Sequence, residues 1–113
     1  MKPATLRRYA LGLPEATESP HFESVSFRVR SRIFATVPPG WGFVHVFVSS
    51  AVREEMLASH PEATEPLTWG GRVVGVRIDL GAAPASLVKS ALRRAWMAKA
   101  PASLAATLES GPE

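Results

Sequence analysis

Arginine is the residue type in this sequence that could do the most chemistry, because three arginines stand close together. Arg28, Arg30 and Arg32 fall within five residues, around a predicted tight turn at Ser31. Guanidinium groups form forked hydrogen bonds with phosphate oxygens. Arg77 lies on another predicted strand, away from the apolar side of that strand, and is expected to join them. The pattern therefore predicts a nucleic-acid-binding surface made of Arg28, Arg30, Arg32 and Arg77.

The same arginines have a plainer explanation. An open sheet face must be polar, and cations at a hairpin prevent edge-to-edge association. Aromatic residues on a neighbouring strand, Phe43 and Phe47 with His45 between them, favour the binding hypothesis if that face is open, because exposed rings stack on bases. Two alternatives remain. The chain is a protein-interaction or regulatory module whose basic residues serve solubility only, or it is a small-molecule binder or an enzyme without a recognisable motif.

No other constellation predicts catalysis, a metal or a cofactor. The sequence has no cysteine, and His21, His45 and His60 do not pair at helical ligand spacing. No serine sits in a G-x-S-x-G elbow. The glycines of Gly40-x-Gly42 and Gly70-Gly71 are too few to form a phosphate-binding loop. We therefore expect a non-catalytic protein with no cofactor and no bound metal.

Composition limits the class of protein. The 113 residues are 46% hydrophobic and 20% charged, with a formal net charge of +3. These values are typical of one globular domain, which we place at residues 1–108, with a flexible tail at 109–113. The segment Met1–Leu13 lacks the apolar stretch of a signal peptide, and no apolar run approaches the roughly 20 residues that span a bilayer. We expect a cytoplasmic protein with no membrane partner.

Hydrophobic periodicity predicts the elements that carry these residues. Helices are expected over Lys2–Gly12, from Ser49 or Ser50 to His60, and from Pro84 to Pro101. Strands are expected over Val25–Val29, Ile33–Val37, Phe43–Val48 and Val74–Leu80. We interpret Leu13–Phe22 as a loop, and Glu62–Thr68 as irregular, with an extra strand at Thr64–Thr68 as the alternative. This predicts an α+β fold, in which helices pack on one face of an antiparallel sheet of four to five strands, in the order α-β-β-β-α-β-α.

The alternation of apolar residues along these elements also predicts the core. Its expected members are Val25, Phe27, Ile33, Val46, Met56, Val76, Ile78, Leu92 and Trp96.

Several short fragments, in order, resemble the MmcQ/YjbR family. Leu13–Glu18 is similar to an early L-P-G-x-x-E loop of that family, with alanine where glycine is usual. Residues 24–35 resemble its F-x-V-x-G-K-x-F-A hairpin, with Ser31 and Arg32 in place of Gly-Lys. His60-Pro61-Glu62, Trp69-Gly70-Gly71, the last strand, Ala95-Trp96 and Ala100-Pro101 follow in the family's order.

The resemblance implies a function as well as a fold. MmcQ/YjbR proteins are small bacterial domains of a frataxin-like (CyaY-like) α+β type, expected to bind DNA through a double-wing motif. The family offers no catalytic residue to carry over. Iron binding in frataxin-like folds needs an acidic ridge, whereas the first helix of this chain carries Lys2, Arg7 and Arg8 and no acidic residue.

Overall fold

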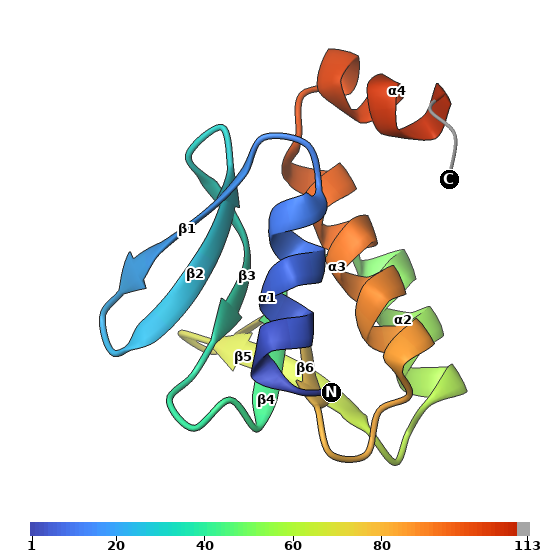
Figure 1. Cartoon of the computed structure of the whole chain (residues 1–113). Coiled ribbons are helices and arrows are strands. Elements are labelled where there is room, and N and C mark those ends of the chain that lie inside the picture. The colour runs from blue at the N-terminus through green and yellow to red at the C-terminus, as the bar shows by residue number, and fades with distance from the viewer. Residues whose placement is uncertain (111–113) are drawn as a thin grey trace.

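The computed structural model describes residues 1–110, in which six strands form one antiparallel sheet (Figure 1). The strands are β1 (Ala16–His21), β2 (Ser24–Val29), β3 (Arg32–Val37), β4 (Phe43–Val46), β5 (Thr64–Trp69) and β6 (Arg72–Asp79). Their order across the sheet is β1-β2-β3-β4-β6-β5. Helices α1 (Pro3–Gly12), α2 (Ser50–Ser59) and α3 (Ala85–Lys99) pack against the sheet, and α4 (Ala102–Ser110) follows. The α+β class predicted from the sequence is confirmed.

The sheet has more strands than predicted, because both edge strands are polar and lack the apolar alternation from which strands were predicted. β1, interpreted as a loop, pairs with β2 along its whole length, from Ala16↔Val29 to His21↔Ser24. β5, the alternative strand, pairs with β6. Pro20 and Pro66 interrupt their patterns, and proline is tolerated in a strand that has a neighbour on one side only. Within residues 1–110 the sheet therefore has six strands, not four or five.

The helices begin and end close to the predicted residues. Ser49 caps α2, because its side-chain oxygen accepts a hydrogen bond from the Val52 N–H at 3.3 Å. α4 was not among the helices expected from the periodicity. The predicted flexible tail, 109–113, begins inside α4, and residues 111–113 lie outside the described part of the chain. No helix in that part is both long enough and apolar enough to cross a bilayer.

Trp96 of α3 is central to the core between helices and sheet. It is fully buried, and its Nε1–H donates to the Pro14 carbonyl at 2.9 Å, which ties the chain after α1 to α3. Seven of the nine predicted core residues are buried: Phe27, Val46, Met56, Val76, Ile78, Leu92 and Trp96. Val25 is partly buried against them.

The ninth predicted core residue, Ile33, is not in this core. Ala35 pairs with Phe27, but Ile33 pairs with Arg28, so Phe34 is an extra residue that forms a β-bulge. Because the bulge reverses the alternation, Phe34 is fully buried in the core, and Ile33 turns to the opposite face beside Arg28. The prediction was wrong because regular alternation assumes a regular strand.

The face without helices is curled, and we call it the concave face. β1 and β5 are the two edges of the sheet, yet His21 of β1 and Trp69 of β5 line the same cavity of about 360 Å³. Strand twist accumulates across a wide sheet and brings distant edges toward each other. Figure 1 shows the β5–β6 hairpin reaching toward the turn between β1 and β2. The concave face therefore has sheltered positions, and Ser26 and Thr36 are buried there.

Candidate nucleic-acid interface

A row of polar side chains crosses the concave face, one from each strand. Strand register aligns Ser19, Ser26, Thr36, His45, Arg77 and Glu65. The hydroxyls of Ser19 and Ser26 are 3.1 Å apart, and the Arg77 and Glu65 side chains approach to 3.6 Å. Hydrogen-bonding partners of this kind let buried polar groups persist in a sheet.

His45, near the middle of this row, is held in its neutral form. Burial and the neighbouring Arg77 guanidinium lower the pKa of the imidazole below its usual value. Arg77 NH1 lies 3.4 Å from His45 Nε2 and can only donate, so Nε2 is the acceptor. The ring proton then belongs on Nδ1, 3.5 Å from Thr36 Oγ1. The Arg77 guanidinium also lies 3.8 Å from the centre of the Phe43 ring, so Arg77 is engaged on three sides.

The three arginines of the first hairpin, β2–β3, contact three different parts of the chain. Arg28 lies on the concave face, where its Nε donates to Ser26 Oγ at 3.1 Å. Regular alternation would place Arg30 on the same face as Arg28, but the strand ends at Val29 and Arg30 is in the turn. Arg30 and Ser31 both have left-handed backbone, with φ of 50° and 69°.

Two of these arginines contact distant parts of the chain. Arg30 forms two hydrogen bonds with the Glu15 carboxylate, at 2.5 and 2.9 Å, which lower the pKa of that carboxyl group. Arg32 NH1 donates to the Lys99 carbonyl at 3.2 Å, where the end of α3 favours a cation. Lys99 in turn lines a cavity with Ile33, Phe47 and Trp69.

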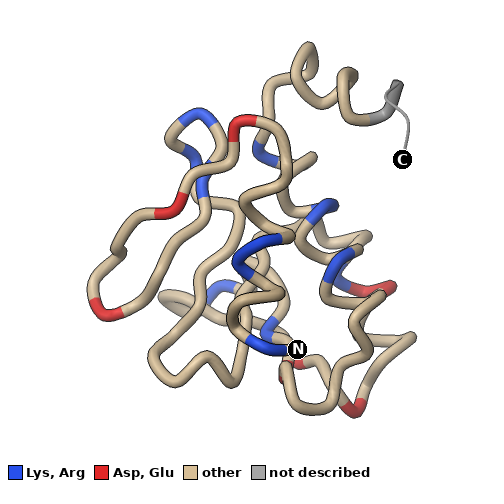
Figure 2. The backbone as a smooth tube through the Cα atoms, viewed as in Figure 1, with Lys and Arg blue, Asp and Glu red and all other residues tan. Residues whose placement is uncertain are grey.

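The tips of the two hairpins are related through the strand register, although the twist of the sheet carries the β5–β6 tip toward the β1–β2 turn (Figure 1). The antiparallel ladders place the turn at 30–31 and the turn of the second hairpin, β5–β6, at 70–71, both beyond the carboxyl end of β4. We call the residues around these tips the hairpin-tip surface: Arg28, Arg30, Arg32, Trp69, Arg72 and Lys99. In Figure 2, blue segments gather at the first hairpin and at the neighbouring end of α3.

Arg77 stands apart from this surface. It lies five residues along β6 from Arg72, which corresponds to about 17 Å. Trp69, Arg72 and Lys99 were not singled out from the sequence. The sequence pattern that could have identified two of them is the turn Gly70-Gly71, which has Trp69 on one side and Arg72 on the other. In the described part of the chain, Arg28, Arg32, Arg72 and Lys99 have no carboxylate partner.

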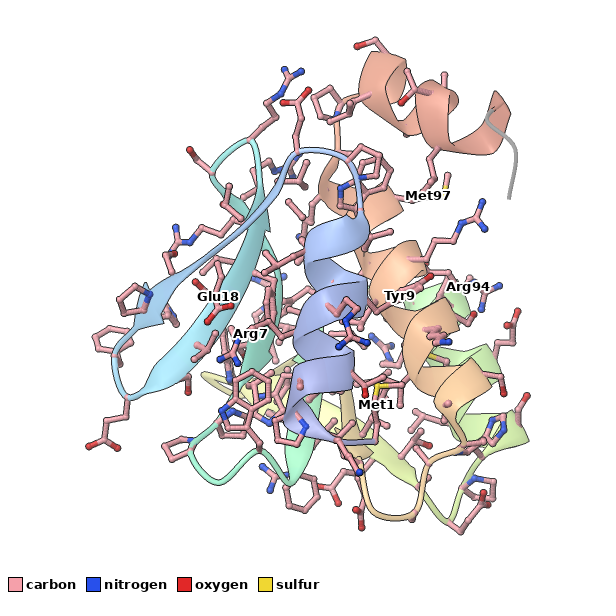
Figure 3. All side chains as sticks on the ribbon, viewed as in Figure 1. Met1, Arg7, Tyr9, Glu18, Arg94 and Met97 are labelled. Atoms are coloured by element: carbon pink, nitrogen blue, oxygen red, sulfur yellow. The ribbon has the colours of Figure 1, made fainter. Side chains whose placement is uncertain are left out.

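A second basic region lies on the helical side. A cavity of about 470 Å³ lies between α1 and α3, with lining residues Thr5, Arg8, Tyr9, Gly12, Leu13, Lys89, Arg93 and Leu108. Figure 3 shows Tyr9 between the two helices, and Lys89 Nζ lies 5.9 Å from the centre of its ring. No acidic side chain described by the structure lines this α1–α3 cavity. Arg94, on the same helix, pairs instead with Glu55 of α2.

The described residues show no obvious metal centre, since no three His, Asp or Glu side chains gather at one point.

Comparison with known proteins places the chain in a family. The crystal structure of Deinococcus radiodurans protein DR2400, which contains domain DUF419, has a similar fold, with a TM-score of 0.72. The two chains are 24% identical, and the similarity covers 84% of this chain and 75% of that one. A search of curated proteins found no match. The YjbR family model matches residues 11–98, from the end of α1 to the end of α3, and the chain therefore belongs to the YjbR family.

Proposed function

We propose that this YjbR protein is a non-catalytic DNA-binding protein that contacts phosphates through the hairpin-tip surface. The observation that carries the proposal is the set of cations at this end of the sheet that have no carboxylate partner in the described chain: Arg28, Arg32, Arg72 and Lys99. Lys99 lines a cavity with the partly exposed Trp69, and Arg72 pairs with Trp69 in the β5–β6 ladder. Cations without a carboxylate partner can exchange water and counterions for phosphate, which is the main source of affinity for DNA.

The internal partners decide which arginines matter most. Arg30 is already neutralised by Glu15, and Arg77 is held by Glu65 and by the face of Phe43. Arg28 and Arg32 donate only to a hydroxyl and a carbonyl, which carry no full charge. We therefore expect Arg28 and Arg32 to contribute more to DNA binding than Arg30 and Arg77. Sequence specificity should be poor, because phosphate contacts carry no base information.

The test is a fluorescence anisotropy titration of a short labelled duplex at two salt concentrations. The variant Arg28→Gln/Arg32→Gln should bind several-fold more weakly than wild type. The slope of log affinity against log salt should flatten by about 0.9 for each phosphate that the variant no longer neutralises, or about 1.8 for two phosphates. Adding Arg30→Gln should have a smaller further effect.

The matched control is Arg53→Gln/Arg94→Gln, which removes the same net charge. Arg53 and Arg94 are paired with Glu54 and Glu55 around α2, away from the hairpin tips. This control should bind DNA nearly as wild type does. Equal binding by wild type and the hairpin variant, or no binding by wild type at low salt, would refute the proposal. The hairpin arginines would then serve solubility, and a protein-interaction module would become the better hypothesis.

The α1–α3 cavity favours a second candidate function, binding of a small anion with an apolar body. Its volume of about 470 Å³ is within the range of small-molecule sites. Arg8 and Lys89 can attract the anionic group, while Tyr9, Leu13 and Leu108 line an apolar wall. Calorimetric titration with alkyl and aryl phosphates and carboxylates tests it, with Arg8→Gln/Lys89→Gln as the variant. If wild type shows no heat of binding, or if the variant binds these ligands as tightly as wild type, this function is excluded.

A further inference from the structure

The concave face contains a second feature, which we call the aromatic notch. It is the cavity of about 360 Å³ with lining residues His21, Phe22, Ser24, Thr36, His45 and Trp69. These residues come from the two edge strands, from the turn between β1 and β2, from the start of β2, and from β3 and β4 in the middle of the sheet. The notch therefore exists only because the sheet curls, and it opens beside the hairpin-tip surface through Trp69.

Phe22 is the unusual residue of the notch. Its side chain is 95% exposed, and its backbone is left-handed, with φ of 58°. A large apolar side chain gains nothing in water, and a glycine would adopt this backbone conformation without strain. Backbone strain of this kind persists where the surrounding structure imposes it, and it is concentrated at functional sites. An exposed ring on strained backbone indicates a contact with something outside the chain.

Trp69 offers a second aromatic surface at the same notch. Its ring packs on Phe47 with 5.0 Å between ring centres, and the residue is still 45% exposed. The contact with Phe47 fixes the indole before any ligand arrives, so ordering it on binding costs little.

Polar side chains also line the notch. Thr36 brings a hydroxyl, and neutral His45 is held by hydrogen bonds to Thr36 and Arg77. Ser24 adds a second hydroxyl at the rim. Two exposed rings in the same cavity as a hydroxyl and an imidazole suit a flat heterocycle that stacks with its face and hydrogen-bonds with its edge. A nucleobase has these properties.

We propose that the aromatic notch holds one unpaired base, so that the protein prefers single-stranded DNA to duplex DNA. This inference rests on the proposed DNA-binding function. Lys99 lines one cavity with Trp69, and Trp69 also lines the notch, so a backbone held at the hairpin tips can place a base there. A base paired inside a duplex has both faces covered by its neighbours and cannot enter.

The experiment compares a labelled oligothymidine of about 12 nucleotides with a duplex of equal length, by fluorescence anisotropy at one salt concentration. Wild type should bind the single strand at least about fivefold more tightly. Phe22→Gly and Trp69→Ala should each weaken single-strand binding by about fivefold or more, the effect of about 1 kcal/mol of stacking energy. Duplex binding should hardly change. Phe22→Gly should be as stable as wild type on urea titration, because glycine relieves the strained φ.

Val73→Ala is the matched control. Val73 lies in the same hairpin as Trp69 and is equally exposed, at 45%, but after a register shift in β6 it pairs with Thr68, the neighbour of Trp69, and so lies on the other face of the sheet. It should bind both DNA forms as wild type does. Equal affinity for both forms, or a single-strand preference that survives in both notch variants, would overturn the inference. The proposed function would stand in either case if Arg28→Gln/Arg32→Gln still weakens binding. If neither form binds wild type, both proposals fail.

Discussion

Gly75 is the position where one methyl group should do most damage to this fold. It lies on β6 next to Val76, whose pairing with Val46 is the last of the ladder that joins the two halves of the sheet. An ideal Cβ built on Gly75 would lie 2.0 Å from the Val46 carbonyl oxygen and 3.2 Å from the Phe47 Cα. Contacts of real Cβ atoms essentially never fall below 3.0 Å. The variant Gly75→Ala must therefore move one strand by about 1 Å against the other.

That movement has two costs. Overpacking of a well-filled site destabilises by about 1–3 kcal/mol. Displacing the Val46 carbonyl weakens the β4–β6 ladder where it is buried, and an unsatisfied buried backbone group costs about 1–3 kcal/mol more. We expect Gly75→Ala to lower the free energy of unfolding by about 2–6 kcal/mol, a large part of the roughly 5–15 kcal/mol typical of a domain.

Urea titration followed by circular dichroism measures this loss, with Gly42→Ala as the control. A Cβ on Gly42 would meet nothing within 4 Å, and its φ lies outside the left-handed region. Gly42→Ala should therefore be neutral or stabilising by up to about 1 kcal/mol, since alanine has fewer unfolded conformations to lose. A loss below about 1 kcal/mol for Gly75→Ala would show that the two strands separate easily, and that the reasoning from close approach is wrong.

Three further predictions test other parts of the structure. The pKa of His45 is lowered in the folded protein, so as the pH falls below about 7 the imidazole is protonated in the unfolded chain before it is protonated in the folded one. The free energy of unfolding should therefore decrease with the pH. Urea midpoints at pH 7.5 and 5.5 should differ less for His45→Gln than for wild type. Ser31→Gly should raise the unfolding free energy by up to about 1 kcal/mol, because glycine adopts φ of 69° without strain; a lower urea midpoint would contradict this. Phe27→Ala should cost about 3–5 kcal/mol, and Ile33→Ala clearly less, because only Phe27 is fully buried in the main core; equal losses in the same titration would show that the β-bulge is misplaced.

The arginine hairpin was predicted only in part, because tertiary partners decide what a charge can do. The spacing of Arg28, Arg30 and Arg32 identified the first hairpin as the basic element. It could not show that Glu15, from the turn before β1, pairs with Arg30, or that the end of α3 brings Lys99 to Arg32. Those contacts join residues that are far apart in the sequence.

The sequence by itself determined the α+β class and most of the core. Strands with one buried face, such as β2 and β6, show the alternation that burial imposes, and the apolar stripe of α3 identified Leu92 and Trp96 in the same way. These features follow from local periodicity, which each segment carries whatever its neighbours are.

Only the tertiary structure decided the rest. β1 is a strand because β2 offers it hydrogen bonds, not because of its own composition. Ile33 faces away from the core because the pairing of β3 with β2 contains a bulge at Phe34. Phe22 and Trp69, near opposite edges of the sheet, line one notch because twist accumulated over six strands curls the sheet, and no single segment encodes that sum.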